Sequence, residues 1–217
     1  QEGETWGMIF SKPSTRTRVS FEVGLRELGG AQLFLNKNDL QMGRGEPIKD
    51  TARVLGRMLH GIVIRTFDQA DIEELAKWGK IPVINALTDE EHPCQILTDI
   101  YTYAEKRGSI VGKKVAYIGD ANNNMARSYA HAAKHFNFQL WLAAPNGYEC
   151  DVTNEHGKAV ESVEEAARGA DLLTTDVWVS MGMEDEAAER EKAFAGYQIN
   201  HDLLQLAHPD ALVLHCL

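Results

Sequence analysis

The sequence predicts an α/β protein with two domains, each a mostly parallel sheet covered by helices, joined by a bridging helix. Short apolar runs alternate with amphipathic segments of helical period along most of the chain, an order typical of parallel sheets with helical crossovers. Hydrophobic residues make up 44% of the sequence and charged residues 25%, the balance of a globular protein with a real core. The length of 217 residues fits two domains, which we expect at residues 1–106 and 107–217.

Capping residues and glycines mark the elements of the first domain. After an apolar strand that ends at Phe10, Ser14 is the expected N-cap of a helix over residues 15–28, which Gly29 and Gly30 terminate. Pro47 stands at the first position of the next helix, where proline is tolerated. We expect the remaining elements to be strands at 32–35, 61–66 and 81–85, a helix at 69–78, and the bridging helix from His92 to about residue 106.

The second domain begins with a strand at 114–118, which runs into a turn and a helix at 125–136. The capping box Ser162-x-x-Glu165 announces another helix. Between Ala144 and Lys158 the chain is short for a crossover helix with its loops, because a crossover needs about 10 to 12 residues at minimum. We expect that helix to be vestigial or absent from the sequence. The other expected elements are strands at 139–143, 171–175 and 212–215 and a helix at 201–207.

Composition argues against several classes of function. The net charge of −10 argues against a nucleic-acid platform, and no apolar run approaches the roughly 18 to 20 residues of a membrane-spanning helix. Cys94, Cys150 and Cys216 form no C-x-x-C pair, so we expect a reducing, cytoplasmic location. His131 and His135 have no carboxylate or cysteine companion, so we expect no metal.

The densest polar cluster is S-T-R-T-R at residues 14–18, where a strand gives way to a helix. A helix N-terminus offers free backbone N–H groups and a partial positive charge, which together with hydroxyl and guanidinium groups suit a phosphate. The plain alternative is an N-cap serine followed by solvated arginines. Arg65 and His92 follow two further strands, so three strand ends converge on a clamp for a phosphorylated carbonyl compound.

The second domain offers an asparagine-rich turn and a carboxylate. The turn G-D-A-N-N-N at residues 119–124 lacks G-x-G-x-x-G, which weakens a nicotinamide-binding interpretation, and its asparagines equally fit a left-handed turn. Asp176, at a strand end, suits an ammonium group. Cys216 follows the last strand at the same edge, although a buried cysteine there is more often inert packing.

At these residues the sequence resembles the aspartate/ornithine carbamoyltransferase family. Four motifs occur in the family's order: S-T-R-T-R from Ser14, H-P-C-Q from His92, D-V-W-V-S-M-G from Asp176 and H-C-L from His215. The resemblance covers essentially the whole chain. Family members have further segments before the equivalent of Gln1 and after H-C-L-P, so we expect this sequence to be part of a longer chain.

For carbamoyl phosphate, the resemblance implies a phosphate site at the helix N-terminus and an oxyanion site made by Thr17, Arg65 and His92. Gln95 would bind the carbamoyl nitrogen. Gln41 matches a position that a neighbouring subunit supplies, which implies a homotrimer, or a multiple of trimers, with shared active sites. The residues implied at this site are Ser14, Thr15, Arg16, Thr17, Gln41, Arg65, His92, Gln95, Cys216 and Leu217.

For the amine, the resemblance implies that Asp176 and Ser180 face the α-amino end of L-ornithine. Cys216 and the carbonyl of Leu217 would lie beside the attacking amine, so Cys216 joins Arg65 and His92 as a catalytic residue. The residues implied at the ornithine site are Asn124, Asp176, Ser180 and Met181.

The implied reaction is transfer of the carbamoyl group from carbamoyl phosphate to the δ-amine of L-ornithine, giving L-citrulline and phosphate, without a protein nucleophile or cofactor. One alternative is a carbamoyltransferase for aspartate, an acylated ornithine or putrescine, although an aspartate enzyme would need cations where Asp176 stands. Another is a non-catalytic, anion-binding fragment of the family. A eukaryotic source would place the protein in the mitochondrial matrix.

Overall fold

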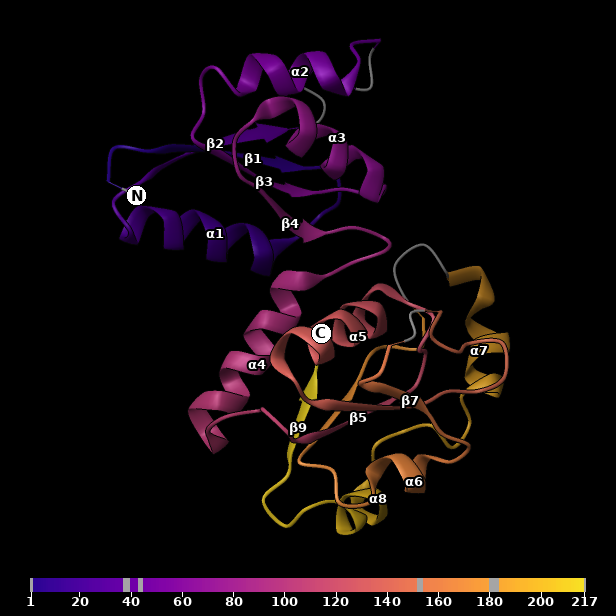
Figure 1. The fold of residues 1–217 in the computed structure, drawn as a ribbon. Helices are drawn as coiled ribbons and strands as arrows, with labels where there is room; N and C mark the ends of the chain where they lie inside the picture. The colour runs from indigo at the N-terminus through magenta and orange to yellow at the C-terminus, as the bar shows by residue number, and fades with distance from the viewer. Residues whose placement is uncertain (1, 37–39, 43–44, 152–153, 180–183, 217) are drawn as a thin grey trace. The chain divides into compact units, whose positions relative to one another are not determined.

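A computed structural model describes the chain except for residues 1, 37–39, 43–44, 152–153, 180–183 and 217. The chain divides into two compact units, Gln1–Cys94 and Gln95–Leu217, each with its own parallel sheet covered by helices (Figure 1). The α/β class with two domains is therefore confirmed. The predicted division after residue 106 falls near the end of helix α4, Pro93–Arg107, and stays a prediction.

The first unit has a four-stranded parallel sheet in the order β2-β1-β3-β4. Helix α1 covers one face, while α2 and α3 cover the other (Figure 1). Alternate residues of β3 serve the two faces, since Val63 packs with Leu25 of α1 and Ile64 packs with Leu75 of α3. The strands are β1 Thr5–Phe10, β2 Ala31–Asn36, β3 Gly61–Arg65 and β4 Val83–Leu87, and the helices are α1 Thr15–Glu27, α2 Ile48–Leu55 and α3 Gln69–Gly79.

Helices α2 and α3 approach closely at two glycines. Gly56, at the end of α2, lies so near α3 that a Cβ atom there would stand 2.0 Å from the backbone oxygen of Gly79. No side chain fits at that distance, so the contact depends on glycine at position 56.

The second unit has a five-stranded parallel sheet in the order β7-β6-β5-β8-β9. Tyr117 of β5 packs with α4 and α5 on one face, and Ile118 packs with α6 and α8 on the other. The strands are β5 Lys114–Ile118, β6 Gln139–Ala143, β7 Gly157–Ala159, β8 Leu172–Thr175 and β9 Leu212–His215; the helices are α4, α5 Asn124–Phe136, α6 Val163–Ala167, the 3-10 turn η2 Glu184–Glu186, α7 Ala187–Ala193 and α8 His201–Leu206.

The structure moves one expected strand and adds two elements that were not expected. The strand predicted at 81–85 lies at Val83–Leu87, because Pro82 has no N–H to donate and the ladder begins after it. Strand β7 and helix α7 were not predicted; β7 is a three-residue edge strand, and the buried residue of α7 is the polar Arg190. Between β6 and β7, the described residues contain no helix, as the short spacing indicated. No described helix is both long and apolar enough to cross a membrane.

Candidate active site

The carboxyl edge of the first sheet carries the S-T-R-T-R cluster. β1 leads into α1, and Ser14 is the N-cap, with its hydroxyl accepting a hydrogen bond from the Thr17 backbone N–H at 3.3 Å. The other N–H groups of the first turn have no partner within the helix, which is the feature that binds anions. Arg16 lies exposed on this turn. Arg18 instead lies over the Phe34 ring, 3.8 Å from its centroid.

Arg65 ends β3 beside this turn, and its residue is only 6% exposed. One guanidinium nitrogen, Nη1, donates to the Thr17 hydroxyl at 3.5 Å. Among the described residues nothing accepts from the buried Nε. Burial also lowers the pKa of Arg65, because a charge is costly away from water. An anion placed here would supply both the missing acceptor and the missing counter-charge.

His92 lies after β4, just before α4. Burial, and then the charge of Arg65, lower the pKa of His92 to about 4. The imidazole is therefore neutral at pH 7 and can donate one hydrogen bond to a carbonyl oxygen without carrying a charge. The two residues thus combine a charged donor with a neutral donor at one strand edge.

Two further motif residues flank the start of α4. Cys94 donates through Sγ to the Asn85 backbone oxygen at 3.2 Å, and burial raises its pKa to about 11, so it is a thiol rather than a nucleophilic thiolate at neutral pH. Gln95 donates through Nε2 to Asp99 Oδ1 at 2.9 Å, one helical turn further on. Gln41 lies exposed between β2 and α2.

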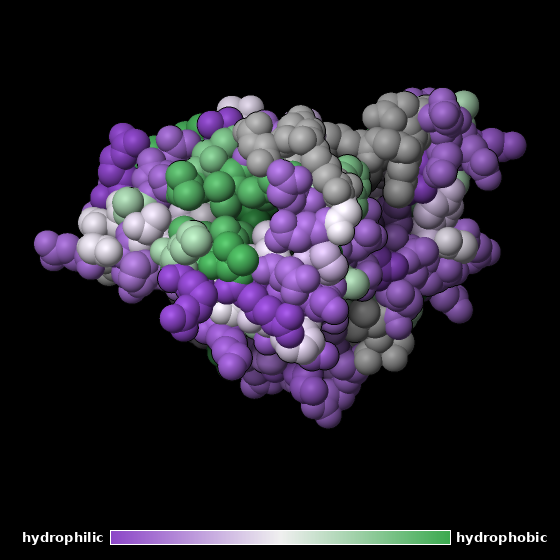
Figure 2. Space-filling view, turned by 90° about the horizontal axis from the view of Figure 1, so that it is seen from above, coloured by the Kyte–Doolittle hydropathy of each residue, from purple (hydrophilic) through white to green (hydrophobic). Residues whose placement is uncertain are grey.

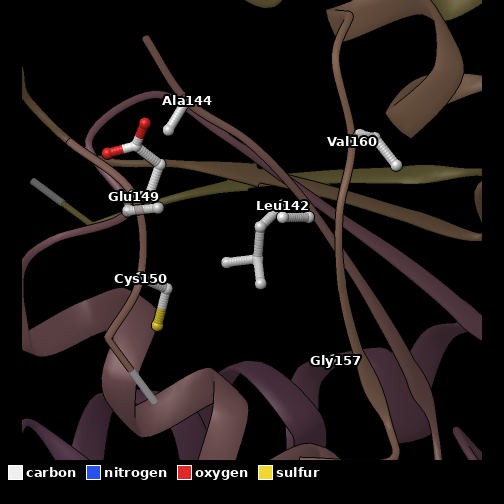
Figure 3. A pocket seen from close by; sticks show the side chains of 8 residues that line it. Leu142, Ala144, Glu149, Cys150, Gly157 and Val160 are labelled. Carbon is white, nitrogen blue, oxygen red and sulfur yellow. The ribbon is translucent and has the colours of Figure 1, made fainter. Parts of the chain in front are cut away.

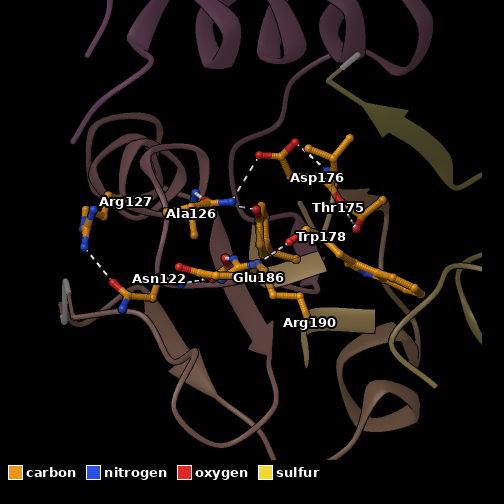
Figure 4. Close-up of polar contacts among 12 residues, drawn as sticks. Asn122, Ala126, Arg127, Thr175, Asp176, Trp178, Glu186 and Arg190 are labelled. Carbon is orange, nitrogen blue, oxygen red and sulfur yellow. Dashed lines mark hydrogen bonds and ion pairs between the residues drawn. The ribbon is translucent and has the colours of Figure 1, made fainter. Parts of the chain in front are cut away.

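In the second unit, Asp176 follows β8 (Figure 4), and its side chain accepts three hydrogen bonds. Its Oδ1 accepts from the Val177 N–H at 2.6 Å and from Cys216 Sγ at 3.0 Å, and its Oδ2 accepts from Asn123 Nδ2 at 3.1 Å. Burial raises the pKa of Asp176, while the bond from Cys216 lowers it. Burial and the Asp176 charge raise the pKa of Cys216, which keeps it a thiol.

Sequence reasoning missed Asn123, whose side chain contacts Asp176. The resemblance implies Asn124, which is the first residue of α5, whereas Asn123 is its N-cap. The Asn123 side chain accepts from the Ala126 N–H and donates to Asp176, so it ties the turn to the carboxylate. The role of Asn124 stays a prediction. Ser180, Met181 and Leu217 lie outside the described residues.

A buried ion pair holds the turn that follows β5. Arg190 of α7 pairs with Asp120, and both side chains are almost fully buried. Its Nε also donates to the Trp178 backbone oxygen at 2.5 Å, and Nη1 pairs with Glu186 at 3.3 Å (Figure 4). One guanidinium therefore holds the turn after β5 and the segment after Asp176 together. Sequence reasoning missed it because an arginine in a polar segment looks like a solvated one.

A small cavity of about 70 Å³ opens beside β6 and β7 in the second unit (Figure 3). Leu142 and Val160 give it an apolar wall, and Glu149 and Cys150 are its polar residues. None of the predicted site residues lines it. Within the described part of the chain, no three His, Cys, Asp or Glu side chains form a group that could hold a metal ion.

The fold and these motifs have close counterparts among known proteins. Residues 1–105 match the family domain described as aspartate/ornithine carbamoyltransferase, carbamoyl-P binding domain, and residues 111–217 match the Asp/Orn binding domain. Ornithine carbamoyltransferase of Acinetobacter baumannii (strain AYE) is 54% identical over 220 residues, covering 99% of this chain and 72% of that protein. The enzyme of that name from Hydrogenovibrio crunogenus is 50% identical over 221 residues, covering 100% of this chain and 73% of that one.

Solved structures agree with the sequence relatives. Ornithine carbamoyltransferase from Pyrococcus furiosus superposes with a TM-score of 0.91 at 46% identity, covering all of this chain and 72% of that one. The protein of that name from Burkholderia thailandensis gives a TM-score of 0.89 at 45% identity, again over all of this chain and 72% of that one. Both halves of the chain are matched, in sequence and in fold. The chain belongs to the aspartate/ornithine carbamoyltransferase family.

Proposed function

We propose that this chain transfers the carbamoyl group of carbamoyl phosphate to the δ-amine of L-ornithine, giving L-citrulline and phosphate. The observation that carries the proposal is that buried Arg65 and a neutral His92 occur together. The Nε of Arg65 lacks an acceptor among the described residues. A phosphorylated carbonyl compound has an anion for the first and a carbonyl oxygen for the second. The relatives named ornithine carbamoyltransferase, at 50 to 54% identity, support the same reaction.

The phosphate would lie at the N-terminus of α1. Backbone N–H groups, the hydroxyls of Ser14, Thr15 and Thr17, and the Arg16 guanidinium would bind its oxygens, and Arg65 would bridge phosphate and carbonyl oxygen. Charge-assisted hydrogen bonds of this kind contribute about 1.5 to 3 kcal/mol each. The resemblance implies that carbamoyl phosphate is also contacted by Gln95, Cys216, Leu217 and the Gln41 of a neighbouring subunit.

In the reaction, the δ-amine nitrogen attacks the carbamoyl carbon, and a tetrahedral intermediate forms with its negative charge on the former carbonyl oxygen. The bond between the carbamoyl carbon and the phosphate oxygen then breaks, its electron pair leaves with the phosphate, and the phosphate takes up the proton that the amine nitrogen gives up. Thr17, Arg65 and His92 would stabilise the oxyanion. One well-placed donor of this type contributes about 2.7 to 4 kcal/mol to lowering the barrier.

The attacking amine must be neutral. With a pKa of about 10.4, an alkylamine is mostly protonated at pH 7, a handicap of roughly 4 to 5 kcal/mol. The positive charge of an arginine-rich phosphate site would lower the pKa of a nearby ammonium group. Burial keeps Cys216 a neutral thiol, so it would contact the amine without adding a negative charge that would hold the proton in place.

The amino-acid end of the substrate would be read by Asp176. Its carboxylate, fixed by Asn123 and Cys216, suits an α-ammonium group and repels the side chain of aspartate. We extend the ornithine site to Asn123 beside the predicted Asn124, because Asn123 contacts Asp176 directly. Ser180 and Met181 are carried over from the resemblance alone.

A homotrimer with shared active sites is part of the proposal. Gln41 is exposed, as a residue that serves a neighbour must be. Large apolar side chains are also exposed on the first unit, among them Leu33, Val54 and Met58, and Figure 2 shows hydrophobic side chains gathered on one face. We propose a cytoplasmic location because the relatives named above are bacterial.

The test is a steady-state assay of the chain with carbamoyl phosphate and four amines: L-ornithine, L-aspartate, N-acetylornithine and putrescine. We expect citrulline formation from ornithine at a kcat/KM at least about a hundredfold above that of any other amine. Faster use of another amine would assign the chain to a different substrate. Phosphate binding without turnover of any amine would identify it as an anion-binding member of the family.

A further inference from the structure

A buried carboxylate on α4 has no part in the reaction proposed above. Asp99 is 6% exposed and lies one helical turn after Gln95. Its two oxygens each accept one hydrogen bond, Oδ1 from Gln95 Nε2 at 2.9 Å and Oδ2 from the Tyr129 hydroxyl at 2.7 Å. Burial raises the pKa of Asp99 and these two bonds lower it. Burying a carboxylate is costly, so its presence calls for a role.

The bond from Gln95 fixes which way round the amide lies. Asp99 is the acceptor of this bond, so the NH2 end of the amide faces Asp99. The carbonyl end, Oε1, is then the end left for a ligand. Without Asp99 the two ends of a glutamine amide are nearly equal in shape and either could face outward.

Asp99 is itself held from the far side. Tyr129 is fully buried on α5 and is hydrogen-bonded to the side chain of Thr174, which is buried on β8. Helix α4, helix α5 and strand β8 thus meet at one carboxylate. A rigid acceptor of this kind orients its donor better than a solvent-exposed one.

The orientation of the amide decides which group it can recognise. A carbamoyl group ends in NH2, which donates hydrogen bonds, and acetyl phosphate carries a methyl group of similar size in its place. An outward Oε1 accepts from NH2 and gains nothing from methyl. A site built to hydrogen-bond a substrate NH discriminates strongly against an analogue that lacks it.

We propose that Asp99 is a positioning residue that holds the Gln95 amide with Oε1 toward the carbamoyl NH2, and so makes the site select carbamoyl phosphate over acetyl phosphate. The inference rests on the proposed function and on the role of Gln95 within it. Asp99 touches neither substrate and acts only through Gln95.

The measurement is the affinity of the full chain for carbamoyl phosphate and for acetyl phosphate, and the readout is their ratio. Asp99→Asn keeps the shape, but its carboxamide can donate to Oε1 as well as accept from Nε2, so the amide orientation is no longer fixed. We expect carbamoyl phosphate to bind ~10-fold more weakly and acetyl phosphate to change less than about twofold. An unchanged ratio would overturn the proposal.

A double-mutant cycle asks whether Asp99 acts through Gln95. Gln95→Ala should lower the ratio by ~10- to 100-fold, and adding Asp99→Asn to it should change the ratio by less than about twofold. Additive losses would mean that Asp99 affects the site by another route and would also overturn the proposal.

Asp171→Asn is the matched control. Asp171 likewise accepts two hydrogen bonds, from the Lys114 N–H at 2.9 Å and Lys113 Nζ at 3.2 Å, but it precedes β8 at the opposite end of the strand from Asp176. It should leave the ratio unchanged even if the protein becomes less stable. A ratio that follows stability in the control and in Asp99→Asn alike would reduce Asp99 to a structural residue.

A second pair of variants covers the case in which Asp99→Asn does not fold. Gln95→Glu sets two carboxylates against each other, whereas Gln95→Glu with Asp99→Asn lets the new amide donate to the new carboxylate and leaves one oxygen outward. The double variant should bind carbamoyl phosphate about fivefold tighter than Gln95→Glu. Equal affinities would contradict the proposal.

The wild-type assay separates this inference from the proposed function. If wild-type chain makes citrulline and Asp99→Asn leaves the ratio unchanged, the inference alone fails. If no amine is carbamoylated but the ratio falls in Asp99→Asn, the positioning role stands and the proposed transfer fails.

Discussion

At Arg65, two features favour the binding of an anion: the side chain is buried, and one of its hydrogen-bond donors has no acceptor among the described residues. Arg65 is 6% exposed and carries a positive charge, and within the described residues its Nε has no acceptor. Neutral His92 beside it adds a donor without adding a second charge. A charged donor beside a neutral one suits an anion next to a carbonyl group, as the proposed carbamoyl-phosphate site requires.

Arg65→Ala should weaken carbamoyl-phosphate binding by about 2 to 4 kcal/mol, because it removes a charged, buried donor. Arg18→Ala is the control, since Arg18 belongs to the same motif but lies over Phe34 and should change the affinity by less than about 0.5 kcal/mol. Calorimetry with inorganic phosphate and carbamoyl phosphate measures both. Equal losses in the two variants would mean that general positive charge, rather than the Arg65 site, binds the ligand.

His92 should make the protein less stable in acid. The pKa of His92 is about 4 in the folded chain and about 6.5 in an unfolded one. Between these two pH values the unfolded state binds a proton that the folded state does not bind. The free energy of unfolding should therefore fall by up to about 3 kcal/mol between pH 6.5 and pH 4. Urea unfolding at several pH values measures this. His92→Gln should lack that part of the acid sensitivity, and identical pH profiles for the two proteins would contradict the shift.

At the scale of elements, helix α7 packs on the rest of its unit through a buried arginine instead of the usual apolar side chains. Arg190 is the buried residue of α7, and its pair with Asp120 joins that helix to the turn after β5. The aromatic ring of Phe194 stacks on Trp178 beside it, at 5.9 Å between centroids. The position of Asp176 and Asn123 therefore depends on a charge pair in the core.

Arg190→Met should lower the free energy of unfolding by about 3 to 5 kcal/mol, because it leaves Asp120 buried without its counter-charge. Adding Asp120→Asn should recover part of the loss. Breaking the exposed pair of Arg53 and Asp50 with Arg53→Met should cost less than about 1 kcal/mol. Chemical unfolding measures all three, and a small loss at Arg190 would show that the pair is not what holds α7.

The elements that sequence could predict are those with local signals. Ser14 and Ser162 were recognisable as N-caps, and the structure confirms that each accepts a hydrogen bond from its own first turn. The site residues expected at strand ends follow from motif and topology, and their roles stay predictions. The contacts of Asp99 with Tyr129, of Asn123 with Asp176 and of Arg190 with Asp120 could not be predicted, since each joins residues 30 or more positions apart that only the folded chain brings together.

At the scale of the whole molecule, each unit has its own sheet and its own apolar clusters. A ligand that touches one unit should therefore stabilise that unit first. Inorganic phosphate, which lacks the carbamoyl group, would contact only the cluster at α1 and Arg65.

Calorimetric unfolding should show two transitions, and phosphate should raise the midpoint temperature of one of them. At a concentration of 100 times Kd, the gain is about 2.7 kcal/mol for the unit that binds. Arg65→Ala should abolish most of the shift while leaving the other transition in place. A uniform shift of both transitions would mean that the units unfold together.

The contact between α2 and α3 bears on how the chain tolerates mutation. At position 56 a new methyl group would meet the Gly79 backbone, which cannot rotate away, so Gly56→Ala should destabilise by about 1 to 3 kcal/mol. Gly24, inside α1, has open space around it, and Gly24→Ala should stabilise by about 0.5 to 1 kcal/mol. In a library that varies every position, selection for folding should therefore keep glycine at 56 and let position 24 drift.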